Sequence, residues 1–181
     1  MPWSSSRPSP SAEPVERCGP CGFEYDLDQA PGAGPAIVAG VATFVAVLGA
    51  ASSDPARRPQ PAVWSPLEYG CHTRDVLLVQ RERVLAARRR DRASFEPMGR
   101  DERVEHDGYG GQDPTSVARQ MTDAAAMFAR VLARLDDSDW ERRVIYTYPA
   151  RTERSLRWVA VHTVHEVRHH LVDVRHQLTP S

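Results

Sequence analysis

The sequence predicts an all-α protein, a four-helix bundle preceded by a leader rich in proline and serine. Four long segments repeat apolar residues every three or four positions, which is typical of a helix with one buried face. Alternating apolar and polar runs, the usual pattern of half-buried strands, are scarce. One long polar connection, residues 93–112, can cross from one helix pair to the other. These three observations favour a helical bundle over other fold classes.

The length and charge of the chain limit what it does. With 181 residues it can form one domain and a tail. We divide it into a flexible leader, residues 1–30, and a bundle, residues 31–178. A net charge of −1 favours neither nucleic acid nor membrane as a partner, so we expect a small-molecule substrate and leave a homodimer open. Three cysteines cannot form a full disulfide framework, which favours a cytoplasmic location.

The leader contains a C-x2-C motif. Residues 1–16 are predicted to be disordered and have no apolar core of a signal peptide. Cys18 and Cys21 match the spacing of a thioredoxin motif, but the preceding residues do not form an apolar strand, so a redox site is disfavoured. A zinc knuckle would need two more ligands, and there is no second cysteine pair. We therefore expect an ordered turn without a metal.

The first predicted helix is the uncharged apolar segment Ala36–Ala51. It is shorter than the roughly 20 residues that a membrane span needs. Larger apolar residues lie on one face and alanines on the rest, so we expect a buried helix of the bundle. The face consists of Ile37, Val41, Phe44, Val45 and Leu48.

The second helix is predicted from Pro66 to about Arg90. Ser65 is a suitable N-cap, Pro66 suits the first helical position, and Glu68 completes a capping box. His72 shares a face with Val76 and Val79 and should point inward. A single histidine on such a face is more often a hydrogen-bonded core residue than a metal ligand. Here it is the one inward histidine outside the last helix, which makes it a candidate ligand.

The third helix is predicted to begin at Asp113-Pro114, with the aspartate as N-cap. Its apolar face extends to Leu135. The segment between the second and third helices, residues 93–112, is predicted to be a long loop. Loops of this length are often functional. Residues 140–152 form a second connection whose structure the sequence does not define.

The last helix is predicted from near Ser155 to about Leu178, and four of the seven histidines lie within its residues 161–173. Residues four apart on a helix can share one metal ion, and two pairs qualify, His165 with His169 and Glu166 with His170. At about 100° per residue, Glu166 and His170 flank the buried stripe, whereas the other pair lies nearly opposite it. We favour Glu166 and His170; the alternatives are the other pair or a solvated polar face. The stripe consists of Ala160, Val164, Val167, Leu171, Val174 and Leu178.

Residues 36–178 resemble the DinB superfamily, which includes the mycothiol-dependent maleylpyruvate isomerases. The resemblance rests on a helical histidine within residues 68–77 and on the segment 166–173. The family's metal triad carries over to His72, Glu166 and His170. The pairing of Glu166 with a following valine, and an aspartate three residues after His170, look like the isomerase branch.

The resemblance implies a divalent metal with an open coordination position. Zinc is the first expectation, with nickel or iron as alternatives, and the cofactor would be mycothiol, bacillithiol or another small thiol. The implied function is a metal-dependent thiol transferase or isomerase, with no catalytic residue assigned. Two alternatives remain: a non-catalytic metal-binding bundle in stress response, and thiol–disulfide exchange through Cys18 and Cys21.

Overall fold

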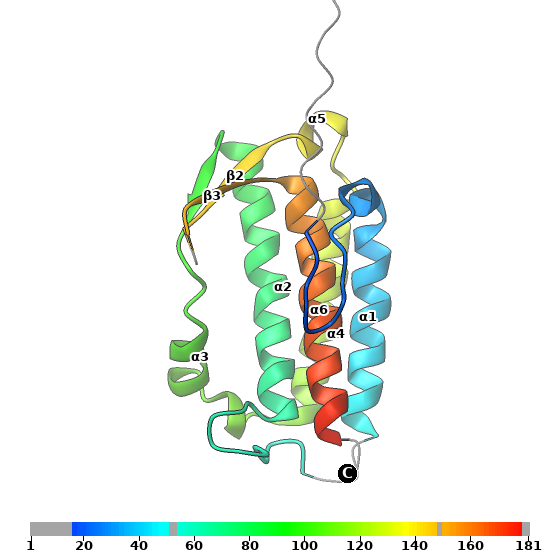
Figure 1. Cartoon of the computed structure of the whole chain (residues 1–181), viewed down its shortest axis with the longest axis vertical. Helices are drawn as coiled ribbons and strands as arrows, with labels where there is room; N and C mark the ends of the chain where they lie inside the picture. Colours follow the sequence, from blue (N-terminus) through cyan, green and yellow to red (C-terminus); the bar gives the residue numbers. More distant parts are fainter. Residues whose placement is uncertain (1–15, 51–53, 148–149, 179–181) are drawn as a thin grey trace, which may run out of the picture.

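Four long helices run side by side and form the body of the protein (Figure 1). A computed structural model describes residues 16–50, 54–147 and 150–178. The four-helix bundle is as predicted, and each long helix begins and ends within about three residues of the expected position. The helices are α1 (Ala33–Gly49), α2 (Pro66–Arg89), α4 (Pro114–Leu132) and α6 (Leu156–Leu178).

Helix α1 packs against α4 and α6. Four residues of its predicted apolar face are buried, Ile37, Val41, Phe44 and Leu48. Among the described residues, the segment Leu27–Gly49 is long and apolar enough to cross a membrane by length and composition. In the structure it contributes a buried face to the bundle core, as predicted for the segment Ala36–Ala51.

The caps of α2 and α4 follow the sequence. Ser65 accepts a hydrogen bond from the Glu68 amide, and the Glu68 carboxylate accepts one from the Ser65 amide, which completes the predicted capping box. Asp113 accepts from the Ser116 amide, and Pro114 occupies the first helical position. The cap at Ser65 fixes where α2 starts, and therefore the position of His72 along the bundle.

The prediction that the fold is all-α is wrong in detail, because a small sheet covers one end of the bundle (Figure 1). Strand β2 pairs in parallel with β1 and antiparallel with β3. Each strand has only three or four residues, too few for an alternating pattern to stand out in the sequence. The strands are β1 (Ala93–Phe95), β2 (Arg143–Tyr146) and β3 (Thr152–Ser155), and the short helix α5 (Asp137–Trp140) precedes β2.

The predicted loop of residues 93–112 is largely structured. Besides β1 it contains the helix α3 (Arg100–His106) and the 3-10 turn η2 (Tyr109–Gly111). Asp75 on α2 holds both in place, because its carboxylate accepts hydrogen bonds from Arg103 at 2.8 Å and from the Tyr109 hydroxyl at 2.7 Å. The segment therefore has a fixed position beside α2.

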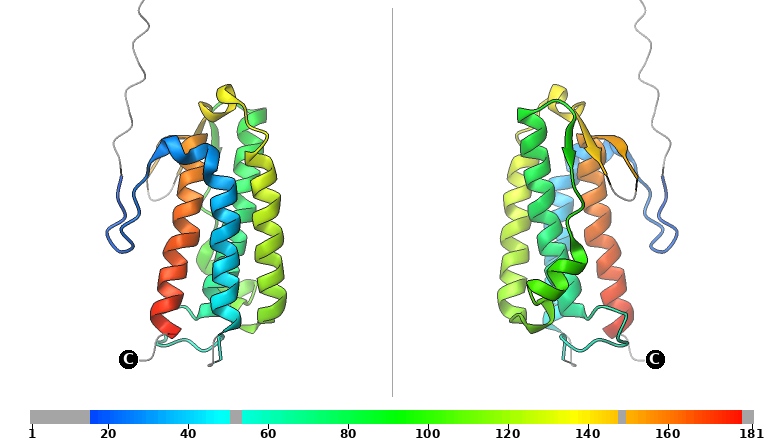
Figure 2. Two further views of the ribbon diagram at one scale, coloured as in Figure 1. Left: turned by 90° about the vertical axis from the view of Figure 1, so that its right-hand side faces the viewer. Right: turned by 90° about the vertical axis from the view of Figure 1, so that its left-hand side faces the viewer.

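The predicted leader also differs from the expectation. Residues 1–15 lie outside the described residues, but residues 16–30 pack against the bundle. The 3-10 turn η1 (Leu27–Gly32) leads into α1, and the segment of residues 16–26, which we call the N-terminal segment, lies along α6 (Figures 1 and 2). Phe23 and Tyr25 are each only 9% exposed. These two aromatic side chains anchor the segment, a role that proline and serine content did not indicate.

Candidate metal centre

Three predicted site residues meet between α2 and α6. His72 Nε2 lies 4.0 Å from Glu166 Oε2, and His170 Nε2 lies 3.6 Å from the same oxygen. One ligand atom from each residue lies within 4.8 Å of the others. The structure thus brings together the residues that the helical pattern and the family resemblance both selected. We call this group the α2–α6 site.

The α2–α6 site lies at the boundary of the core. The His72 side chain is 6% exposed, while those of Glu166 and His170 are 19% and 14% exposed. Nδ1 of His72 is buried without a hydrogen-bond partner among the described residues. Buried polar atoms without a partner are uncommon and often mark a place where an ion or a water molecule binds. Two imidazoles and a carboxylate suit zinc and similar divalent ions.

Asp173, one turn further along α6, orients His170. Its Oδ2 lies 3.1 Å from His170 Nδ1, which leaves Nε2 directed toward Glu166. A carboxylate on the far nitrogen of a metal-binding histidine fixes the ring and increases its basicity. Burial alone would lower the pKa of His170, but its contacts with Asp173 and Glu166 raise it to about 9.

The pKa values of His72 and Glu166, the other two residues of the α2–α6 site, are also shifted by burial and by neighbouring groups. Burial lowers the pKa of His72 to about 4, and the neighbouring His170 adds to the effect. Burial would raise the pKa of Glu166, but hydrogen bonding with His165 and His170 holds it well below its usual range. His72 therefore presents a neutral imidazole and Glu166 an ionised carboxylate, the forms in which these groups bind metals, whereas His170 has to release its proton when an ion binds.

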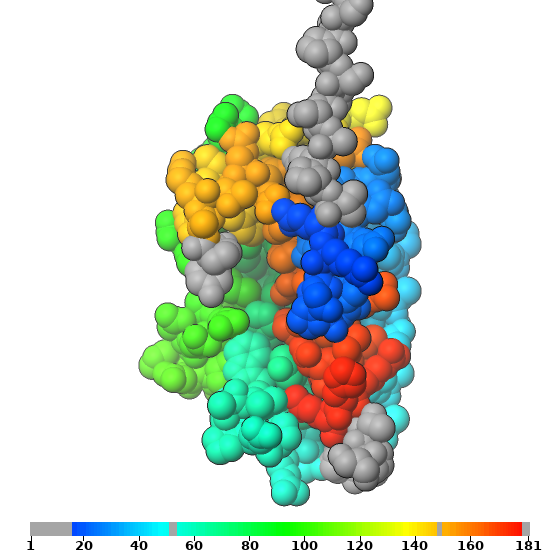
Figure 3. Space-filling view, in the orientation of Figure 1, coloured from blue at the N-terminus to red at the C-terminus, as the bar shows by residue number. Residues whose placement is uncertain are grey.

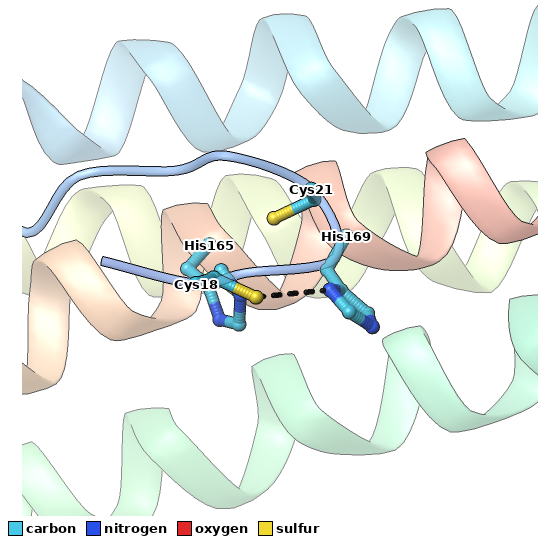
Figure 4. A group of neighbouring side chains, drawn as sticks. All are labelled: Cys18, Cys21, His165 and His169. Carbon is cyan, nitrogen blue, oxygen red and sulfur yellow. Dashed lines mark hydrogen bonds between the residues drawn. The ribbon is translucent and has the colours of Figure 1, made fainter.

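The alternative pair, His165 and His169, faces a different part of the molecule. Both side chains project toward the N-terminal segment, where Cys18 and Cys21 lie (Figure 4). The sequence placed this pair opposite the buried stripe, yet His165 is only 8% exposed. It is buried because the rings of Phe23 and Tyr25 pack on it, each with its centroid 5.3 Å away.

Candidate metal ligands therefore follow α6 on two adjoining faces. Four groups of candidate ligands occur among the described residues, and two of them use residues of α6 alone. The remaining two draw on a second segment and share no residue: His72 with Glu166 and His170, and the two cysteines with His165 and His169. Sequence reasoning identified the cysteine pair and the histidine pair separately. It did not connect them, because they are about 150 residues apart.

Asp173→Asn should weaken metal binding at the α2–α6 site by about 10- to 100-fold, the usual effect of losing an outer carboxylate. An amide of nearly the same size keeps the packing but lacks the charge that supports His170. Competition with a chelator of known affinity would measure the change, in a Cys18→Ser/Cys21→Ser background so that the neighbouring group of Cys18, Cys21, His165 and His169 does not contribute. Asp123→Asn, the same substitution on an exposed position of α4, should leave the affinity unaltered. Equal affinities for all three proteins would exclude a role for Asp173.

Comparisons with known proteins support the fold and show the family. A solved structure, YfiT from Bacillus subtilis, described as a probable metal-dependent hydrolase with an unusual four-helix bundle topology, superposes with a TM-score of 0.67. The two chains are 13% identical, and the match covers 97% of this chain and 95% of YfiT. No curated protein matches the sequence. The family model of the DinB superfamily matches residues 38–173, about three quarters of the chain, and the chain therefore belongs to that superfamily.

Proposed function

We propose that this member of the DinB superfamily is a metal-dependent enzyme whose divalent ion is held by His72, Glu166 and His170. The observation that carries the proposal is the meeting of two imidazoles and one carboxylate, from two helices, at a core boundary with Asp173 behind one of them. The description of YfiT as a probable metal-dependent hydrolase supports the same general activity.

The ligand count favours catalysis over a purely structural role. Three protein ligands leave room for an exchangeable fourth, whereas structural zinc sites are usually closed by four. The partial exposure of Glu166 and His170 gives that fourth position a route to solvent. A divalent ion bound there would supply Lewis acidity and lower the pKa of a water or thiol in the open position.

The buried Cys71 does not offer its thiol to the α2–α6 site. Cys71 precedes His72, but its sulfur is buried and faces the Tyr109 carbonyl and the Gln112 side chain. Burial raises the pKa of the Cys71 thiol to about 12, so it stays protonated. A reacting thiol would therefore come from a small cofactor such as mycothiol, bacillithiol or glutathione. Hydrolysis, with water in that position, is the second candidate, and the description of YfiT favours it.

A spectroscopic titration tests the proposal and separates the two reactions. Cobalt would replace the native ion in a Cys18→Ser/Cys21→Ser protein, so that any sulfur signal comes from an added thiol. We expect a sulfur-to-cobalt charge-transfer band with at least one of mycothiol, bacillithiol and glutathione. No band with all three, on protein whose cobalt content is confirmed, would exclude thiol activation and leave hydrolysis. No cobalt bound at all would contradict the metal centre itself.

The metal ion and the substrate are separate parts of the proposal. Zinc is the expected ion, with nickel or iron as alternatives, and elemental analysis of protein purified without chelator identifies it. The substrate is expected to be a small molecule that reaches the partly exposed side of Glu166 and His170.

A further inference from the structure

We propose that Cys18, Cys21, His165 and His169 form a second metal site, a closed Cys2His2 zinc site that fastens the N-terminal segment to α6. The site adjoins the α2–α6 site but shares none of its residues. It does not depend on the proposed enzyme function.

The distances suit a tetrahedral ion. In Figure 4 the two cysteines of the N-terminal segment face the two histidines of α6, and the four ligand atoms lie within 4.8 Å of one another. Cys18 Sγ lies 3.6 Å from His169 Nδ1. Tetrahedral zinc, with bonds of about 2.3 Å to sulfur and about 2.05 Å to nitrogen, places those two atoms about 3.6 Å apart. This pair therefore already has the separation that a shared ion requires.

The backbone around the cysteines is shaped to present both sulfurs. The Cys18 amide donates to the Phe23 carbonyl and the Gly22 amide donates to the Cys18 carbonyl, each at 2.8 Å, which closes a tight loop. Gly22 has a φ of +68°, a left-handed conformation that a side chain would strain.

The histidines supply independent support. His165 is 8% exposed; its Nδ1 lies 3.4 Å from Glu166 Oε1, and its Nε2 is buried without a hydrogen-bond partner among the described residues. Leaving a polar group buried without a partner is unfavourable, and coordination to an ion would satisfy one nitrogen. His169 Nδ1 faces Cys18, while its Nε2 lies 3.6 Å from Asp173 Oδ2. His169 thus has the outer carboxylate that metal-binding histidines usually contact.

The donor set indicates a structural role. Two thiolates neutralise the charge of Zn²⁺, and two neutral imidazoles complete four-fold coordination without an open position. Binding would release the two thiol protons to solvent. The zinc ion would hold the N-terminal segment in the position in which Phe23 and Tyr25 are buried against α6. Figure 3 shows the outer surface of this segment, which lies over the helix.

The zinc content of wild type and matched variants tests the proposal. In protein purified without chelator, Cys18→Ser/Cys21→Ser should contain one zinc equivalent per chain fewer than wild type. Cys71→Ser, which removes the buried cysteine outside the site, should lose none. His72→Ala/His170→Ala should keep the cysteine-dependent equivalent. The test compares the zinc content of wild type with that of the variant, so its result does not depend on whether the α2–α6 site holds zinc. If the α2–α6 site holds no zinc and the proposed cysteine–histidine site does, wild type contains one equivalent and Cys18→Ser/Cys21→Ser contains none.

Cobalt substitution provides a second measurement, which does not need the Cys18→Ser/Cys21→Ser variant to fold. Wild-type protein loaded with cobalt should show intense sulfur-to-cobalt bands in the near ultraviolet without added thiol, and Cys71→Ser should keep them. Absence of these bands, on wild-type protein with cobalt confirmed, would overturn the proposal. So would equal zinc content in wild type and Cys18→Ser/Cys21→Ser, or a Cys18–Cys21 disulfide in protein purified anaerobically with reductant.

Discussion

His170→Ala should reduce the affinity of the α2–α6 site for its divalent ion by more than about 100-fold. Losing a residue that only hydrogen-bonds to a metal ligand already costs up to about 100-fold in affinity, and His170 is itself a ligand. The substitution removes one of three protein ligands and leaves Asp173 without the ring that it orients. The remaining pair, His72 and Glu166, would hold an ion far less well. This is the largest effect on metal binding that we expect from one substitution outside the cysteines.

The measurement needs a protein in which only the α2–α6 site binds metal. We would make His170→Ala in the Cys18→Ser/Cys21→Ser background and titrate it against a competing chelator. The neighbouring substitution His169→Ala, in the same background, is the matched control and should leave the affinity within a few fold. The opposite result, with His169→Ala losing the metal and His170→Ala keeping it, would identify His165 and His169 as the ligand pair on α6.

Asp75→Asn should lower the free energy of unfolding by about 3 kcal/mol, the lower end of the range for breaking a buried ion pair. Asp75 is 4% exposed, and its carboxylate accepts hydrogen bonds from Arg74, Arg103 and the Tyr109 hydroxyl. An amide can accept from only one of its two polar atoms. Arg74 is itself 8% exposed and would lose its closest negative partner. Denaturant unfolding at neutral pH would measure the loss, with Asp101→Asn, an exposed position, as the unaffected control.

The effect of Asp75→Asn should also depend on pH. Burial would raise the pKa of Asp75, but Arg74, Tyr109 and Arg103 outweigh it and lower the pKa. A carboxyl with a depressed pKa in the folded state stabilises the protein above its unfolded pKa of about 3.9 and loses that contribution as the pH falls through the folded value. The difference between wild type and Asp75→Asn should therefore shrink below about pH 4. A difference that stays constant down to pH 2 would exclude the carboxylate charge as its cause.

Sequence alone predicted the long helices well, because their boundaries are encoded locally. The capping box of Ser65 and Glu68 and the Asp113-Pro114 start lie where the chain turns into α2 and α4. The three strands were missed because pairing between residues near 94 and 145 is a long-range property of short segments. Propensity carries little information about such pairs.

The candidate metal ligands also include some that the sequence could predict and some that it could not. His72, Glu166 and His170 could be selected from the sequence because helical geometry places the last two on one face and directs the first inward. The site that contains Cys18 and Cys21 could not be selected from the sequence, because the two further zinc ligands were expected to be a second pair of cysteines. The missing ligands are histidines on a helix that the N-terminal segment reaches only in the folded chain. Phe23 and Tyr25, just after the C-x2-C motif, were the local sign that this segment packs.

The N-terminal segment has a consequence for the order in which the molecule is assembled. The contact between Cys18 and His169 joins residues 151 positions apart, and that between Tyr25 and His162 spans 137. During synthesis the segment leaves the ribosome well before α6, so its docking surface does not yet exist. Contacts of this span also form late in refolding, since they close the longest loops. Protection of the segment from proteases therefore reports that the rest of the chain has finished folding.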